Sequence, residues 1–307
     1  MGICVSTWKN GWSLFDVEKF KRASHCLKFL WLLLVLTAAS RYLVHQGAQL
    51  RQMVASCSLA RFSGALIFIL LGRVAVCKIA SLAITTSEGN ISFKDMFRLY
   101  NRTQLGKYIP GGLWHIVGRA AIYTRFGLSA KAAGSALLRE NLWLIISSCS
   151  FGLMLCGPTL LTRCLGKEVG FIGLLLAICL ASALYYLSSL LTQRVLGGRA
   201  VTSIDWQLAT WFCFGLAFAL LLPQGLNPSS LCLAMGTFSL AFGLGLAFPI
   251  APSGIGIREA VIYWFFVGIL SPQESIGLAA VSRVLWTLGE FVMAIAAELL
   301  VIAYDRD

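Results

Sequence analysis

Two short motifs rich in proline and glycine carry the residues best placed for chemistry in this chain. The first, Tyr108–Trp114, reads YIPGGLW and is followed by Arg119. The second, Pro249–Gly256, reads PIAPSGIG and is followed by Arg258 and Glu259. Proline and glycine interrupt helices and leave backbone groups without intrahelical partners. Because such breaks are tolerated at membrane depth only inside protein or beside a polar cavity, they predict a binding site or passage within the membrane.

An arginine close behind each break suits the binding of an anion. A helix that restarts after the break presents unpaired N–H groups and the positive end of its dipole. Arg119 and Arg258 would add guanidinium donors, which match phosphate geometry well. We therefore predict that both arginines bind an anionic headgroup. The residues expected to bring the backbone close to this ligand are Pro110, Gly111, Gly112, Pro252, Gly254 and Gly256.

Further charged residues inside apolar segments complete the predicted site. A charge at the bilayer centre costs about 2.5–3.5 kcal/mol even on the mild insertion scale, so such groups are expected to pair, to face a cavity or to lie at an interface. Arg283 and Glu290 lie two helical turns apart on one face of the last apolar segment. We expect Arg283 to assist headgroup binding. Glu140, Glu259 and Glu290 would orient the cations or relay a proton.

The composition predicts that an all-α polytopic membrane protein holds these residues. The chain is 58% hydrophobic and 12% charged, about half the charged fraction of a soluble domain. Several stretches approach the ~20 apolar residues that span a bilayer. We expect long helices over residues 28–45, 64–84, 141–162, 169–190, 207–223, 230–248 and 276–303, with shorter ones over 113–124 and 259–270. This gives seven to eight transmembrane helices, with two re-entrant or broken Pro-Gly segments, in one domain over 28–303 after a cytoplasmic tail over 1–27.

The basic residues predict the orientation of the chain. The net charge of +12 belongs to the loops of a membrane protein and does not indicate nucleic-acid binding. Lysines and arginines crowd residues 9–28, which places the N-terminus in the cytoplasm. The uncharged loop 224–229 is expected outside, and counting back from it places 85–107 and 125–140 in the cytoplasm. The short segment 113–124 then enters and leaves on one face, as a re-entrant segment does.

The two motifs open units that resemble a duplication, over residues 107–162 and 249–303. In each unit a short apolar helix with an early arginine and a tyrosine follows the break, and a long helix then carries an arginine and a tryptophan near its start. Transporters place interrupted helices from two such halves around a central site. The charge count predicts that both units have the same orientation. The alternative is a chance similarity between apolar segments rich in glycine.

The remaining sequence features indicate a surface helix and no metal chemistry. The segment Phe93–Tyr108 mixes apolar and basic residues, which predicts a helix on an anionic leaflet or an ordinary cytosolic loop helix. The chain has ten cysteines but only three histidines, and no CxxC pair. Most of these cysteines fall in apolar segments, where free thiols behave as small hydrophobic groups. We expect no metal and no cofactor.

Lys107–Trp114 and Pro252–Glu259, with the later Arg283, resemble the signatures of the lysylphosphatidylglycerol synthase transmembrane-region family, also called the flippase-like domain family. The resemblance covers roughly residues 25–303. It implies a bacterial or archaeal inner-membrane protein of about eight helices, related to enzymes that make and flip aminoacylated phosphatidylglycerol and to stand-alone members linked to envelope polysaccharide synthesis. We expect no synthase activity, because the soluble aminoacyl-transfer domain is missing. Ser253 stands where glycine is common, so that turn is less permissive of positive φ.

These observations favour a lipid translocase that is not an enzyme. We expect it to move an anionic phospholipid or a polyprenyl-phosphate-linked lipid across the inner membrane in envelope or polysaccharide biogenesis. Its partners would be membrane lipids and envelope-biosynthesis proteins, with no nucleic acid. A membrane glycosyltransferase is disfavoured because the first outer loop, 46–63, contains no carboxylate. A non-transporting accessory subunit of an assembly system remains an alternative, since it would keep the same fold.

Overall fold

The computed structural model describes the chain from Ser58 to Tyr304 with short gaps. The described ranges are 58–84, 89–108, 114–166, 168, 170–197, 200–223, 226–248 and 254–304. All of them belong to one compact unit that begins at Ala48. The predicted tail 1–27 and helix 28–45 lie outside the described residues. So do Pro110, Gly111, Gly112 and Pro252.

Within these ranges the chain is helical and forms no β-strand. The helices are α2 (Leu59–Leu82), α3 (Phe93–Gln104), η1 (Leu105–Tyr108), α4 (Trp114–Arg125), α5 (Ala130–Leu165), α6 (Gly170–Leu196), η2 (Ala200–Ser203), α7 (Ile204–Ala219), α8 (Pro228–Ala247), α9 (Ile257–Phe266) and α10 (Pro272–Tyr304). Five of the described helices, α2, α5, α6, α8 and α10, are long and apolar enough to cross a membrane. The predicted all-α membrane protein is thereby confirmed, and its described helices fall where the apolar segments predict them.

Short polar side chains begin these helices. Ser58, Ser92 and Ser129 accept hydrogen bonds from backbone N–H groups of the first turns of α2, α3 and α5. Asn227 does the same for α8, at 2.7 Å from the nitrogen of Ser230. Such caps satisfy donors that have no partner within the helix, and each typically contributes about 1 kcal/mol. The helix starts are therefore encoded locally, by residues next to the apolar segments.

Arginines at both ends of α5 bind the carbonyl ends of other helices. Arg139 donates from Nε to the carbonyl of Ala83 at the end of α2 (2.7 Å) and from Nη1 to that of Leu196 at the end of α6 (2.6 Å). Near the other end of α5, Arg163 donates from Nη2 to the carbonyl of Phe265, at 3.0 Å, where α9 ends. The last carbonyls of a helix have no partner within it and carry its negative dipole end, so cations stabilise them. Both ends of α5 are thereby tied to neighbouring helices.

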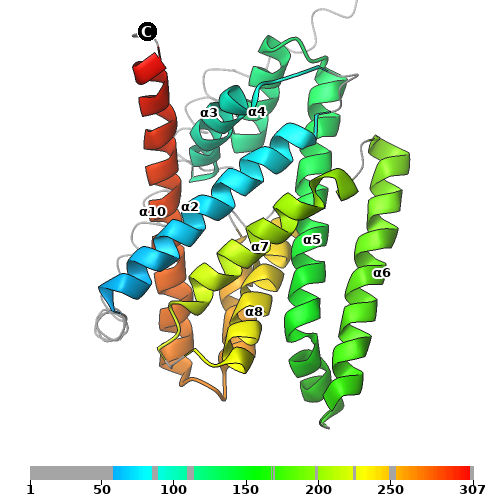
Figure 1. Cartoon of the computed structure of the whole chain (residues 1–307), viewed down its shortest axis with the longest axis vertical. Helices are drawn as coiled ribbons and strands as arrows, with labels where there is room; N and C mark the ends of the chain where they lie inside the picture. The colour runs from blue at the N-terminus through cyan, green and yellow to red at the C-terminus, as the bar shows by residue number, and fades with distance from the viewer. Residues whose placement is uncertain are drawn as a thin grey trace, which may run out of the picture. The chain divides into compact units, whose positions relative to one another are not determined.

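The long helices of the two proposed units, α5 and α10, run in opposite directions (Figure 1). Glu140 at the start of α5 pairs with Arg119 of α4, which packs on α3. Glu298 near the end of α10 pairs with Arg102 of α3, at 3.5 Å. At the opposite end, Arg163 of α5 contacts α9 shortly before α10 begins. The prediction that the two units share an orientation is therefore wrong.

The reversal arises because α9 returns along α8. Gly236 lies against Cys156 and Gly243 against Ser148, so α8 runs antiparallel to α5. Helix α9 then begins against the last turns of α8 and ends beside the last turns of α5. As a result, α10 starts from the side on which α8 began. The charge count treated 230–248 as a complete crossing, and the apolar pattern of α9 contains no signal for the direction in which it returns.

An aromatic cluster fills the centre of the described unit, where α7, α8 and α10 meet. Phe214 and Trp286 make its closest contact, edge to face, with ring centroids 4.5 Å apart. Trp211, Phe238 and Phe242 complete it. Large rings dominate the packing energy of such a core and hold a defined geometry. The cluster therefore provides a rigid support for the charged residues that surround it.

Candidate anion-binding site

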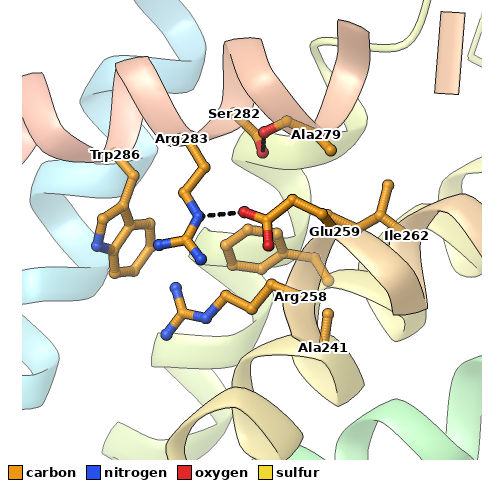
Figure 2. A pocket seen from close by; sticks show the side chains of 9 residues that line it. Ala241, Arg258, Glu259, Ile262, Ala279, Ser282, Arg283 and Trp286 are labelled. Carbon is orange, nitrogen blue, oxygen red and sulfur yellow. Dashed lines mark hydrogen bonds and ion pairs between the residues drawn. The ribbon is translucent and has the colours of Figure 1, made fainter. Parts of the chain in front are cut away.

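Arg258 lies in the first turn of α9 and has hydrogen-bonding capacity to spare. Its guanidinium stacks on the ring of Phe242, with 4.0 Å between Cζ and the ring centroid, and lies 5.9 Å from the centroid of Trp286. Within the described ranges its Nε has no hydrogen-bond partner, and the guanidinium makes no ion pair. Figure 2 shows it pointing away from the neighbouring Glu259. A guanidinium placed in this way can accept an anionic ligand without first breaking an ion pair.

Glu259 is turned toward Arg283 of α10 instead. Arg283 Nε donates to Glu259 Oε1 at 2.6 Å (Figure 2). The second carboxylate oxygen, Oε2, accepts the backbone N–H of Gly256 at 2.7 Å, which caps the start of α9. Gly256 has a φ of 89°, a left-handed conformation that glycine adopts without steric cost. Glu259 therefore holds both the turn before α9 and the arginine on the opposite helix.

Glu290, fully buried in α10, binds two cations and two neutral donors. Arg73 of α2 donates to it at 2.9 Å, Trp286 at 2.8 Å and the hydroxyl of Tyr108 at 2.6 Å. Lys107 of η1 also donates to Glu290. Burial lowers the pKa of the Lys107 ammonium to about 8, while the charge of Glu290 opposes this effect. Two cations around one carboxylate leave an excess of one positive charge.

Arg119, by contrast, is paired with a carboxylate, although its Nε, like that of Arg258, has no hydrogen-bond partner within the described ranges. Its Nη1 lies 2.6 and 2.7 Å from the two carboxylate oxygens of Glu140, and its Nη2 donates to Gln104 Oε1 at 3.1 Å. Its guanidinium also stacks on the ring of Tyr100, at 3.9 Å. Both partners of the ion pair are buried. This arrangement is neutral and stabilises the contact between α4 and α5.

Two cavities flank the aromatic cluster. One, of about 50 Å³, is bounded by Arg73, Arg119, Glu140, Phe242 and Trp286 among others. At ~10–15 Å³ for each water, it has room for a few water molecules. The other, of about 10 Å³, is bounded by Arg258, Glu259, Arg283 and Trp286 among others (Figure 2). Phe242 and Trp286 therefore separate the Arg119 side from the Arg258 side.

Around Trp286 the cations outnumber the carboxylates. Arg258 and Arg283 lie on one side of its ring, and Glu290 with its two bound cations lies on the other. The set contains four cations and two carboxylates, Glu259 and Glu290, and so carries two excess positive charges. Solvent screens the buried charges of Arg73 and Glu290 weakly and the partly exposed Arg258, Glu259 and Arg283 more strongly, and the excess positive charge of the set attracts an anion. We call the set Arg73, Lys107, Arg258, Glu259, Arg283 and Glu290 the cationic cluster.

The structure brings together some of the residues predicted for the site and separates others. Arg258, Glu259, Arg283 and Glu290 gather around Trp286, whereas Arg119 and Glu140 form an ion pair beyond the aromatic cluster. Sequence reasoning missed Arg73 and Lys107 as site residues. The signal for Arg73 was a charge inside an apolar helix. Comparison with models of known protein families finds no match, and comparison with curated proteins finds none either.

Proposed function

We propose that this protein is a flippase-like lipid translocase, which binds the anionic headgroup of a phospholipid or of a polyprenyl-phosphate-linked lipid at the cationic cluster. The observation that carries the proposal is Arg258, a half-buried guanidinium that stacks on Phe242, has a buried Nε without a hydrogen-bond partner and makes no ion pair within the described ranges. A buried donor that is left without a partner in this way is costly. A phosphate ligand would remove that cost.

The neighbouring residues have distinct parts in this proposal. Arg283, held by Glu259, is oriented before the ligand arrives and would donate to the same phosphate. Glu290 neutralises half of the charge of Arg73 and Lys107. This neutralisation would limit the affinity for the anionic headgroup and so permit its release. The apolar tails would stay in the lipid phase while the headgroup crosses. No covalent step is required of these residues.

The arrangement of the helices supports a transport role. Two helix breaks, each followed by a long helix, belong to units whose long helices run in opposite directions (Figure 1). Transporters with inverted repeats place a central site between such halves. The proposal includes seven to eight crossings with two re-entrant segments, a cytoplasmic N-terminus, and residence in a bacterial or archaeal inner membrane. It also includes a role in envelope or polysaccharide biogenesis.

A reconstituted transport assay tests the proposal. Purified protein would be placed in liposomes that contain fluorescent phosphatidylglycerol or a fluorescent polyprenyl phosphate, and movement between leaflets would be followed by quenching. We expect the native protein to move one of these lipids and Arg258→Ala to abolish the movement. Arg125→Ala, at an exposed position on α4, is the matched control and should retain the native rate.

Two outcomes would contradict the proposal. Transport at the native rate by folded Arg258→Ala would remove Arg258 from the mechanism. If the native protein moved neither lipid, the accessory-subunit alternative would be favoured. Arg258→Lys adds a graded comparison, since it keeps the charge but loses the planar fork that binds phosphate through two hydrogen bonds. We expect it to retain only part of the transport rate.

A further inference from the structure

A third cavity lies apart from the cationic cluster, between α5, α6 and α7. Its volume is about 210 Å³. Helix α7 begins near the end of α6 and runs obliquely to α5 and α6 (Figure 1). The residues that characterise its wall are Ser147, Ser150, Ala181, Tyr185, Gln207 and Trp211. We call it the α5–α7 cavity.

The wall of the α5–α7 cavity is polar in places but carries no charge among the described residues. Ser147 already accepts a hydrogen bond from Trp211 Nε1, at 2.8 Å, and donates to the carbonyl of Trp143, at 2.6 Å. Gln207 donates to Ser203 Oγ at 2.7 Å. Without a cation in its wall, the cavity offers nothing to neutralise a phosphate or carboxylate. Its ligand is therefore neutral, unlike the ligand of the cationic cluster.

Ser150 provides a hydrogen-bonding group that is ready for such a ligand. It is only 7% exposed, and its hydroxyl has no hydrogen-bond partner within the described ranges. Serine inside a helix commonly satisfies its hydroxyl with a carbonyl one turn back. A buried polar group left unsatisfied costs about 1–3 kcal/mol. A ligand hydroxyl in the cavity would recover this energy, because it can both donate and accept.

The surroundings of the cavity indicate that the ligand comes from the membrane. Leu208 of α7, which lines the cavity, and Leu184 of α6, which adjoins the lining residue Tyr185 in the sequence, are exposed. Helix α6 is a candidate membrane span, and most of its outward side chains are apolar. An amphiphile that enters between α6 and α7 would leave its hydrocarbon chain among these residues. Only its polar end would need the interior of the cavity.

We propose that the α5–α7 cavity binds a neutral membrane lipid through a hydroxyl group, with Ser150 as its hydrogen-bond partner. The shared chemistry is a hydrocarbon chain that ends in an alcohol, which a polyprenol and a diacylglycerol both present. This site is independent of Arg258 and of the headgroup proposed to bind there. It would place a second, uncharged lipid against α5, the helix that ties α2, α6 and α9 together.

Photolabelling of the full chain tests this site. The probes are dodecanol with a photoactivatable diazirine and the matched dodecanoic acid, added to purified protein in detergent, with labelled peptides located by mass spectrometry. We expect the alcohol to label peptides covering 147–154 or 204–211, and the acid to label them much more weakly. Unlabelled farnesol and dioctanoylglycerol serve as separate competitors, and the stronger one identifies the source of the hydroxyl.

Three variants sharpen the result. Ala181→Phe should abolish the labelling by filling the cavity, whereas Leu180→Phe, on the exposed face of α6, should leave it unchanged. Ser150→Ala removes one oxygen without disturbing the packing and should weaken competition by the alcohol about fivefold. Equal labelling by alcohol and acid, or labelling confined to the exposed face of α6, would overturn the proposal. So would an unchanged affinity in Ser150→Ala, which decides the matter even if Ala181→Phe fails to fold.

Discussion

Arg119 and Arg258 follow the two Pro-Gly breaks at similar positions, yet they have opposite surroundings. Arg119 is buried against both oxygens of Glu140, a carboxylate on another helix. Arg258 has an aromatic ring on one side and no carboxylate partner in the described ranges. A buried cation with its own carboxylate is a structural element, whereas one without a partner is suited to a ligand. The two breaks therefore differ in the task that their arginine can perform.

The position of the nearest carboxylate explains this difference. Glu259 adjoins Arg258 in the sequence, and neighbouring residues on a helix point about 100° apart. Glu259 thus faces α10 and pairs with Arg283, while Arg258 faces Phe242. Glu140 lies on α5 and approaches Arg119 from across the interface. Glu140 on a second helix can neutralise Arg119, whereas Glu259, adjacent to Arg258 on the same helix, points away from it.

The largest loss of stability is expected when the Arg119–Glu140 ion pair is broken. Removing one partner leaves the other as an uncompensated buried charge, so Glu140→Ala should lower the free energy of unfolding by about 3–5 kcal/mol. Arg258→Ala should change it by less than about 1 kcal/mol, because it removes no ion pair. Equilibrium unfolding in detergent would measure both. The double variant Arg119→Met with Glu140→Leu should recover most of the loss, and similar losses for Glu140→Ala and Arg258→Ala would contradict the comparison.

An intermediate effect is expected at the contact between α5 and α8. A Cβ atom on Gly236 would lie 2.7 Å from the backbone nitrogen of Cys156, so the helices would have to separate. Gly236→Ala should therefore destabilise the protein by about 1–3 kcal/mol. Gly134→Ala is the control, since a Cβ there meets nothing within 4 Å. In thermal unfolding, Gly236→Ala should lower the melting temperature and Gly134→Ala should raise it, because alanine in an open helical position stabilises by about 0.5–1 kcal/mol. A Gly236→Ala protein as stable as the native one would show that this interface is loosely packed.

The smallest expected effect on stability tests the orientation of Arg283. Glu259→Gln removes the charge that binds Arg283 but can still accept the N–H of Gly256. The pair is partly exposed, so the loss of stability should be about 0.5–1 kcal/mol at most. The rate of lipid transport by Glu259→Gln should nevertheless fall clearly, because Arg283 is no longer held in place. The liposome assay measures this, and unchanged transport would show that Arg283 needs no such support.

The helices and the approximate positions of the charges were determined by the sequence alone. Helix formation depends on local apolar length and on caps such as Ser129 and Asn227, so most boundaries of the described helices could be predicted to within a few residues, although α6 extends to Leu196, past the predicted end at residue 190. The first turns of α5 were missed, since residues 130–140 are too polar to read as a membrane span. An arginine behind each break was also evident from the sequence.

Only the tertiary structure decided which charges meet and in which direction the second unit runs. Lys107 and Arg73 reach Glu290 from distant parts of the chain, and no local pattern specifies such a contact. The return of α9 along α8 depends on close packing at Gly245 and Gly254, and it reverses α10 relative to α5. Ion pairs between helices depend on the way apolar faces fit together, whereas helices depend on neighbours within four residues. For that reason the two arginines look equivalent in the sequence and differ in the folded protein.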